Sequence, residues 1–355
     1  MRRIGGEETK RHVLVDGNNL IYRAYYAHVE SRINSGKPLL SGPGGYPTGV
    51  IYGSLSMLSS WLYSISDITK ISVFFDGYPK RRKILYPEYK SNRDSTSRSG
   101  LRLTSKSSTI DLNKKLLDGY EASGEVDILS HIFSLLGCDV YHHPEEEADD
   151  LIASFCKSNQ ECIRFIISSD KDFFQLLTDN RIICYIPGVD GGFYDAEKST
   201  QRWAKMNKGK HPAIPPSSVR MFKALCGDSS DGIFGIDRLR KKVAATLCQH
   251  TSVDDLLKGN LNVMSGSERK NLLSSVDKVR LNYELVGLYD SIDLSSCIRE
   301  IGKDDFSIAT NILNQDLGIL HIDVSPFRLG TNQIKINLSS SLPETIPMDA
   351  WLREI

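Results

Sequence analysis

Several features that define common protein classes are missing from this sequence of 355 residues. No apolar run reaches the roughly 18–20 residues that a membrane-spanning helix needs. The first ten residues lack the apolar stretch of a secretory signal. Seven cysteines occur without any Cys-x-x-Cys pair, which argues against a zinc site and a disulfide framework and favours a reducing compartment.

A net charge is missing as well, because 44 basic residues balance 44 acidic ones. The total therefore gives no sign of a nucleic-acid partner, but the distribution of charge does. Residues 80–115 contain eleven Lys and Arg and three acids, and residues 198–223 contain seven Lys and Arg and no acid. Basic stretches are thus separated from acidic ones along the chain.

Five short apolar segments predict strands at residues 12–16, 71–76, 138–143, 163–170 and 181–186. Segments with helical spacing lie between most of them, which predicts an α/β fold with a mostly parallel sheet and helices on both faces. Helical patterns dominate after about residue 197. We expect one domain over 12–197, a helical domain over 198–325 and a tail over 326–355.

Acidic residues stand where the predicted strands end. Asp16, Asp76 and Asp170 each close one strand, and the acidic stretch 145–150 follows another. Ligands of open parallel sheets bind beyond the carboxyl ends of the strands, so these acids should converge. The expected cluster consists of Asp16, Asp76, Glu147, Asp149, Asp150, Asp170, Asp172, Asp228 and Asp231.

Each of these acids alone is weak evidence, because a strand-end Asp is usually a helix cap or a turn former. Together they would repel one another unless cations lay among them. Ligation by oxygen alone favours Mg²⁺ or Mn²⁺. Two such ions, roughly 3.5–4 Å apart, form a clamp for phosphodiester hydrolysis. We therefore expect two Mg²⁺ ions, for which Mn²⁺ can substitute, and phosphoryl chemistry.

Five motifs carry a resemblance to a known family. They are HVLVDGNNLIYRAYY, VFFDGYPKRRKILYPEYKSNRD, EEEADDLIASF, ISSDKDFFQLLTDN and GDSSDGIFGI. Their order resembles that of the 5′-nucleases, which comprise flap endonucleases, phage 5′–3′ exonucleases and the 5′-nuclease domain of bacterial DNA polymerase I. The resemblance covers roughly residues 12–250. It implies a PIN-like sheet, a helical arch at about 80–120 and a C-terminal helix–turn–helix domain that binds duplex DNA.

The resemblance also implies residue roles. The first metal site would be formed by Asp16, Asp76, Glu147 and Asp149, with Asp170 near both ions. The second would be formed by Asp150, Asp170, Asp172, Asp228 and Asp231. Lys90 and Arg93 match basic residues of the arch, and with Asp170 they are the expected catalytic residues. Residues that match DNA-contacting positions are Tyr22, Arg23, Lys223 and Lys242.

The sequence departs from the family at one turn of the helix–turn–helix element. Family members have Gly-x-Gly-Ile-Gly turns there, often with a K⁺ ion, whereas this chain has Arg238 and Arg240 in place of the later glycines. The departure argues against a K⁺ site. We hypothesise that Arg238, Arg240, Lys241 and Lys242 hold phosphates by side-chain charge.

The expected function is that of a Mg²⁺-dependent, structure-specific 5′-nuclease, both a 5′–3′ exonuclease and a flap endonuclease. Its expected substrates are branched or nicked DNA and RNA/DNA hybrid, from which it would remove RNA primers or flaps in replication. We expect a monomer without membrane contact in the cytoplasm of a bacterium or a phage-infected cell. The amphipathic end IPMDAWLREI favours docking to single-strand binding protein or a sliding clamp.

Two alternatives stay open at this point. One is a PIN-type endonuclease for single-stranded RNA, which shares the sheet and the acids but normally lacks the arch and the duplex-binding domain. The other is a structure-specific DNA-binding protein without catalysis, although every acid of the motif set is present.

Overall fold

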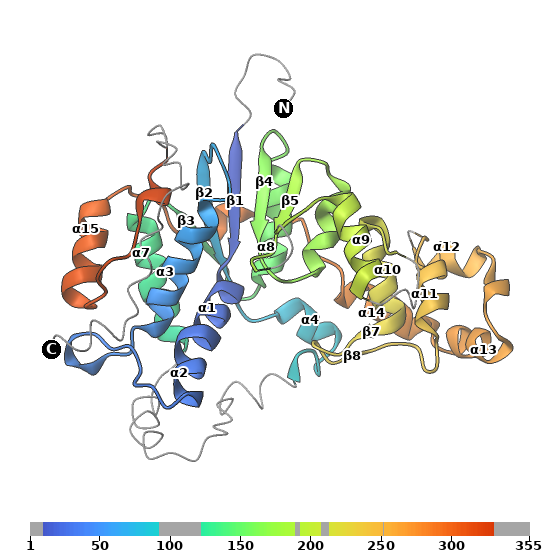
Figure 1. The fold of residues 1–355 in the computed structure, drawn as a ribbon. Helices are drawn as coiled ribbons and strands as arrows, with labels where there is room; N and C mark the ends of the chain where they lie inside the picture. The colour runs from blue at the N-terminus through green and yellow to red at the C-terminus, as the bar shows by residue number, and fades with distance from the viewer. Residues whose placement is uncertain (1–9, 92–121, 189–191, 207–212, 251, 330–355) are drawn as a thin grey trace.

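The computed structural model describes residues 10–91, 122–188, 192–206, 213–250 and 252–329. Its centre is a seven-stranded sheet in the order β6-β5-β4-β1-β2-β3-β9 (Figure 1). The five inner strands run parallel, as predicted, and the two edge strands are antiparallel to their neighbours. The strands are β1 Arg11–Asp16, β2 Lys70–Phe75, β3 Asp139–His142, β4 Ile163–Ile167, β5 Ile182–Tyr185, β6 Phe193–Tyr194 and β9 Ile298–Glu300.

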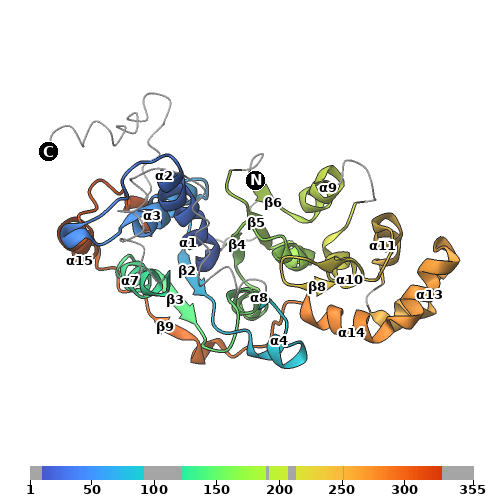
Figure 2. The same ribbon diagram turned by 90° about the horizontal axis from the view of Figure 1, so that it is seen from below.

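Helices cover both faces of the sheet (Figures 1 and 2), because successive residues of an inner strand point to opposite faces and both are apolar. Val13 and Val15 belong to one buried cluster, and Leu14 between them belongs to the other. The first cluster includes side chains of α1 Gly17–Tyr25, α3 Gly49–Leu62, α7 Ala122–Leu135 and α15 Phe306–Asn311. The second includes those of α8 Ala148–Ser158 and the 3₁₀ helix η3 Asp172–Thr178.

A layer of helices continues from the second face beyond the sheet edge at β6 (Figure 2). Helix α10 contacts both η3 and α14, so this layer shares its core with the sheet. A hairpin of two short strands, β7 Gly227–Asp228 and β8 Ile233–Phe234, lies between α10 and α11. The helices are α9 Ala196–Met206, α10 Pro216–Cys226, α11 Lys241–Leu247, α12 Val253–Lys258, α13 Gly266–Ser274 and α14 Val276–Leu285.

The structure differs from the expected domain division after α14. Residues 298–327 fall within or next to the range expected to be a helical domain, yet they return to the sheet. Strand β9 pairs with β3, and α15 packs against α7. An antiparallel pairing of three residues leaves too weak a pattern for the sequence to predict it. The assignment of functions to the ranges 12–197, 198–325 and 326–355 stays a prediction.

The expected arch is described only at its beginning. Helix α4 spans Lys80–Leu85, and the description continues to Ser91. The rest of the arch, including Arg93, and the tail beyond Leu329 lie outside the described residues. All seven cysteines are described and carry free thiols. No helix in the described ranges is both long and apolar enough to span a bilayer.

Candidate active site

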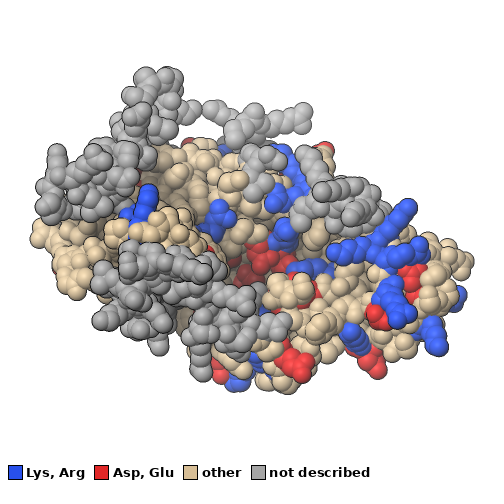
Figure 3. Space-filling model, turned by 60° about the horizontal axis from the view of Figure 1, so that its bottom comes forward, with Lys and Arg blue, Asp and Glu red and all other residues tan. Residues whose placement is uncertain are grey.

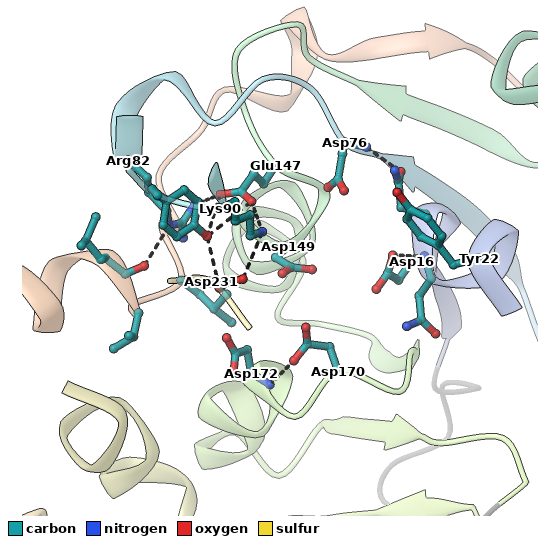
Figure 4. Close-up of a pocket in the computed structure, with 16 residues that line it drawn as sticks. Asp16, Tyr22, Asp76, Arg82, Lys90, Glu147, Asp149, Asp170, Asp172 and Asp231 are labelled. Carbon is teal, nitrogen blue, oxygen red and sulfur yellow. Dashed lines mark hydrogen bonds and ion pairs between the residues drawn. The ribbon is translucent and has the colours of Figure 1, made fainter. Parts of the chain in front are cut away.

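The strand-end acids converge on one cavity, as the sequence analysis expected (Figure 4). The cavity has a volume of about 170 Å³ and opens on a hollow in which acidic side chains gather (Figure 3). Nine of the predicted site residues line it, namely Asp16, Tyr22, Asp76, Lys90, Glu147, Asp149, Asp170, Asp172 and Asp231. Further lining residues are Asn18, Asn19, Arg82, Tyr89, Leu285, Val286 and Leu288.

Local hydrogen bonds explain why the acids sit where they do. Asp16 ends β1 and caps α1, since its Oδ1 accepts the Asn19 amide at 2.9 Å. Asp76 follows β2, and its Oδ1 accepts the amide of Ala148 at the start of α8 at 2.8 Å. Asp170 follows β4 and accepts the amide of Asp172 at 2.8 Å. Each acid thus joins a strand end to the segment that begins beside it.

Two adjacent asparagines, which the sequence analysis did not single out, tie these strand ends together. The side-chain oxygen of Asn18 accepts the Asp76 amide at 2.8 Å. The side-chain nitrogen of Asn19 donates to the Ser169 hydroxyl at 2.8 Å. Helix α1 is therefore bonded to the ends of β2 and β4 at once. The quoted DGNN motif contained this signal, but only the topology shows which strands the asparagines reach.

Crowding of the carboxylates disturbs their ionisation. Burial, reinforced by the neighbouring Asp76, raises the pKa of Asp16 to about 7. Burial and repulsion by Asp170 raise the pKa of Asp149 well above its usual value. Burial also raises the pKa of Asp172 to about 7, against the opposing effect of Lys223. The cluster therefore favours the entry of positive charge.

One lysine already supplies positive charge at the far end of this cluster. The Lys223 ammonium lies 2.6 Å from Asp228 Oδ2 and also bonds Asp172. Burial opposes its charged form, but the two acids outweigh burial and raise the pKa of Lys223. Asp172, Asp228 and Asp231 each offer a carboxylate oxygen, and these three oxygens lie within 4.8 Å of one another. Among the described residues, this trio brings three possible metal-ligand atoms that close together, and Lys223 pairs with two of its members.

The acidic stretch pairs with helix α4 residue by residue. Its three glutamates, which are Glu145, Glu146 and Glu147, face three consecutive bases. Lys80 lies 2.6 Å from the first, Arg81 2.9 Å from the second and Arg82 2.6 Å from the third. Exposure falls along the series, and only the third pair reaches the cavity. These bases supply part of the charge that neutralises the acids, so the expectation that metal alone supplies it is incomplete.

Lys90 is held at the cavity by both its backbone and its side chain. Its backbone adopts a left-handed conformation with a φ of 54°, and its backbone amide donates to the Asp231 carbonyl at 3.0 Å. Its ammonium bonds Glu147 and lies 4.0 Å from Asp231 Oδ1. Burial opposes the charge of Lys90, but Glu147 outweighs it and keeps the pKa of this lysine well above its usual value.

Two predicted acids do not line the cavity: Asp228 stays in the carboxylate cluster beside Asp172, whereas Asp150 turns away from the cluster as well. Its side chain is 1% exposed, and its two oxygens accept both terminal nitrogens of Arg82. Oδ1 also accepts the backbone amide of Tyr289 at 2.8 Å. The carboxylate is thus fully engaged within the protein, and the metal-ligand role expected for Asp150 has no support in this geometry.

Tyr22 and Arg23 are adjacent residues that were both expected to contact DNA. Only Tyr22 lines the cavity, and it is 53% exposed. The side chain of Arg23 instead donates to the Pro187 carbonyl at 3.2 Å and lies over the Trp61 ring. Tyr22 therefore presents an aromatic ring at the rim, whereas Arg23 is engaged by Pro187 and Trp61.

The basic residues after β8 also separate into two kinds. Arg240 makes two 2.8 Å bonds with Glu268, which links α11 to α13. Arg238 has a φ of 55° and its side chain is 86% exposed. Lys241 and Lys242 are exposed at the start of α11. The hypothesis of phosphate contacts thus fits three of the four residues better than it fits Arg240.

Comparison with known proteins adds family information to this geometry. Residues 11–205 match the family described as "5′-3′ exonuclease, N-terminal resolvase-like domain". DNA polymerase I of Bacillus subtilis is 30% identical over 283 residues, which cover 78% of this chain but 28% of that protein. A 5′-3′ exonuclease of Aquifex aeolicus is 25% identical over 305 residues, covering 85% of this chain and 88% of that protein. The chain therefore spans less than a third of its DNA polymerase I relatives.

Two solved structures share the fold. The bacteriophage T5 flap endonuclease, in a complex with DNA and metal ions, has a TM-score of 0.57 at 20% identity. The match covers 87% of this chain and 95% of the T5 chain. Flap endonuclease-1 of Methanococcus jannaschii has a TM-score of 0.50 at 16% identity and covers 90% of this chain and 92% of its own.

Proposed function

Because this chain belongs to the 5′-3′ exonuclease family, we propose that it is a structure-specific 5′-nuclease with both exonuclease and flap endonuclease activity. It hydrolyses phosphodiesters near junctions between single-stranded and duplex nucleic acid, as in the removal of RNA primers or flaps during replication. The observation that carries the proposal is the convergence of acids from five separate segments on one cavity, with the Lys90 ammonium among them. The DNA complex of the T5 flap endonuclease supports the same substrate class.

The donor set of the cavity fits divalent metal. The proposed ligands all offer carboxylate oxygens, which suit Mg²⁺ or Mn²⁺. One ion would be held by Asp16, Asp76, Glu147 and Asp149, and a second by Asp170, Asp172, Asp228 and Asp231. Two such ions would supply an activated water and stabilise charge on the attacked and departing oxygens. A solved structure of T5 5′-exonuclease, which shares the fold, contains bound divalent zinc ions, and this supports a divalent-metal site here.

Other residues of the chain position the substrate. Lys90 reaches the cavity from the root of the expected arch, where its ammonium would offset charge on the scissile phosphate. Tyr22 at the rim presents a ring on which an unpaired base would stack. Arg238, Lys241 and Lys242 are exposed and would contact the phosphates of the duplex without regard to sequence.

The proposal is tested with a 5′-labelled DNA flap incubated with and without Mg²⁺. We expect cleavage within a few nucleotides of the junction, products with 5′-phosphates and complete inhibition by a chelator. The Asp170→Asn variant should bind the flap with little change in affinity and fail to cut it. Turnover by that variant would reject the mechanism.

The two alternatives give different results in the same assay. A PIN-type RNA endonuclease would cut a single-stranded RNA of matched sequence faster than the flap. A protein without catalysis would bind the flap and leave it intact at every Mg²⁺ concentration. The helical layer that adjoins the cavity favours the flap nuclease over the first alternative, because it brings exposed basic residues to a duplex beside the site.

A further inference from the structure

Arg82 is a buried arginine whose five N–H donors all have acceptors. Its side chain lies in the wall of the cavity and the residue is 7% exposed. Nε donates to the Leu285 carbonyl at 2.9 Å. Nη1 donates to Glu147 Oε2 at 2.6 Å and to Asp150 Oδ2. Nη2 donates to Asp150 Oδ1 and to the Gly287 carbonyl, each at 2.8 Å.

These acceptors join three segments that are distant in sequence. Arg82 belongs to α4, at the root of the expected arch. Glu147 is the N-cap of α8 and Asp150 lies in its first turn, while Leu285 ends α14 and Gly287 follows that helix. One guanidinium therefore fixes α4 to the sheet and to the helical layer at the same time. A lysine could not replace it fully, because an ammonium offers three donors without a planar fork.

The orientation of Glu147 depends on two bases. Its Oε2 is held by Arg82 and its Oε1 by Lys90. Each oxygen of this carboxylate therefore contacts a different cationic side chain, as the dashed lines in Figure 4 show. If Lys90 turns toward a substrate, Arg82 still holds Glu147 Oε2 at 2.6 Å.

Asp150 completes the arrangement from the side away from the cavity. A buried guanidinium between two carboxylates would be costly if one of them left to bind metal and no other anion remained. Asp150 remains, since it makes a two-pronged pair with Arg82 and accepts the Tyr289 amide. The charge of Arg82 therefore stays balanced when Glu147 faces a metal ion.

We propose that Arg82 is a positioning residue that holds Glu147 for metal, and that Asp150 is the buried counter-charge of Arg82 and not a metal ligand. The inference rests on the proposed function only in taking Glu147 as a ligand. It gives the second of two adjacent aspartates a different task from the first, because Asp149 lines the cavity and Asp150 does not.

The chain offers matched controls one residue away. Arg81 also pairs with a glutamate of the acidic stretch, Glu146 at 2.9 Å, but this pair lies outside the cavity. The side chains of that pair are 40% and 16% exposed, against 9% and 6% for Arg82 and Glu147. Arg81→Lys therefore makes the same chemical change at a residue that does not line the cavity. Asp149→Asn serves as the control for loss of a true ligand.

The test measures Mn²⁺ binding by calorimetry without DNA. The proteins are the wild type, the variants Arg82→Lys, Arg81→Lys, Asp149→Asn and Asp150→Asn, and the double variant Arg82→Lys/Asp150→Asn. Loss of an outer partner of a metal ligand typically weakens metal binding by about 10–100-fold. We expect a loss of that size for Arg82→Lys and no change for Arg81→Lys. Asp150→Asn should weaken binding in the wild type but add nothing in the Arg82→Lys background.

Several results would overturn the proposal. If the Arg82→Lys variant bound Mn²⁺ as tightly as the Arg81→Lys variant, Arg82 would not be a positioning residue. An equal loss from Asp150→Asn in both backgrounds would make it an independent ligand. Circular dichroism verifies folding, and if Arg82→Lys does not fold, the number of ions bound by Asp150→Asn decides: the wild-type number supports the proposal and a smaller one rejects it. A wild type that binds Mn²⁺ but cuts no flap would defeat the proposed function alone.

Discussion

The backbone amide of Lys90 donates to the backbone carbonyl of Asp231 at 3.0 Å, which joins the root of the expected arch to the β7–β8 hairpin. The bond requires the left-handed backbone of Lys90, whose φ is 54°. Left-handed backbone is costly for any residue with a Cβ, by roughly 1–2 kcal/mol. The protein thus accepts local strain at the residue whose ammonium reaches the acidic cavity.

Replacing Lys90 by Gly and by Ala distinguishes the contribution of its ammonium group to activity from the contribution of its backbone conformation to stability. Both variants lose the contact with Glu147, and we expect both to cleave a flap roughly 100-fold more slowly. Glycine adopts a positive φ freely, so Lys90→Gly should be more stable than Lys90→Ala by about 1 kcal/mol. Urea denaturation of the two variants measures the difference, and equal stabilities would contradict the role given to the strained backbone.

Without metal, the protein should become more stable when the side chain of one proposed metal ligand is replaced. Asp149 is crowded by Asp170, Asp16 and Asp76, so Asp149→Asn removes repulsion from the cluster. We expect the variant to be more stable than the wild type without metal, by about 1 kcal/mol. Addition of Mg²⁺ should reverse the order, because only the wild type binds the ion fully. Thermal midpoints recorded with chelator and with Mg²⁺ test both statements.

His12 should make the stability of the fold depend on pH. Its Nε2 lies 2.9 Å from the Ser72 hydroxyl, its ring meets the edge of Phe155, and burial lowers its pKa to about 4. The unfolded chain binds this proton near pH 6.5, whereas the folded chain does so only near pH 4. Stability is therefore lost as the pH falls from about 6.5 to 4, by up to roughly 3 kcal/mol, and is unaffected by His12 at higher pH.

The His12→Gln variant isolates this effect, because its amide can still bond Ser72 but does not titrate. Urea midpoints of the wild type and the variant should fall by different amounts between pH 7.5 and pH 5, with the smaller fall in the variant. If the urea midpoints of the two proteins fell by the same amount, His12 would not be the cause of the loss of stability at low pH.

Binding to duplex DNA should distinguish Arg238 from Arg240. Arg238 is exposed and its ion pair is with the adjacent Asp237, so Arg238→Gln should lower the slope of affinity against salt by about one unit if the arginine contacts one phosphate. Arg240 is engaged with Glu268, so Arg240→Gln should mainly lower the thermal midpoint. Fluorescence anisotropy at several salt concentrations measures the slopes, and a steeper loss for Arg240→Gln would reverse the assignment.

Much of the site could be predicted because it depends on topology alone. Parallel strands present their carboxyl ends at one edge, so Asp16, Asp76 and Asp170 had to meet once the strands were recognised. The two asparagines after Asp16 could not be assigned, because their partners belong to strands whose order the sequence does not state.

The charge pairing of α4 with the acidic stretch could not be predicted for a different reason. Both segments were noticed as charged, but charge in a sequence does not say which partner neutralises it. Asp149 and Asp150 illustrate the limit. They are adjacent and chemically identical, yet one faces the cavity and the other faces Arg82, because a helix turns by about 100° per residue.

The return of the chain to β9 has a consequence for any shortened form of the protein. A single cut before Ile298 would remove the strand that covers β3 and leave an inner parallel strand as a bare edge, open to pairing with another molecule. It would also remove Phe327, which is fully buried in the cluster that contains side chains of α1, α3, α7 and α15. The helices between β6 and β9 therefore form an insertion between two strands of the same sheet. They can be removed by an internal deletion that rejoins the two strands, but not by truncating the chain.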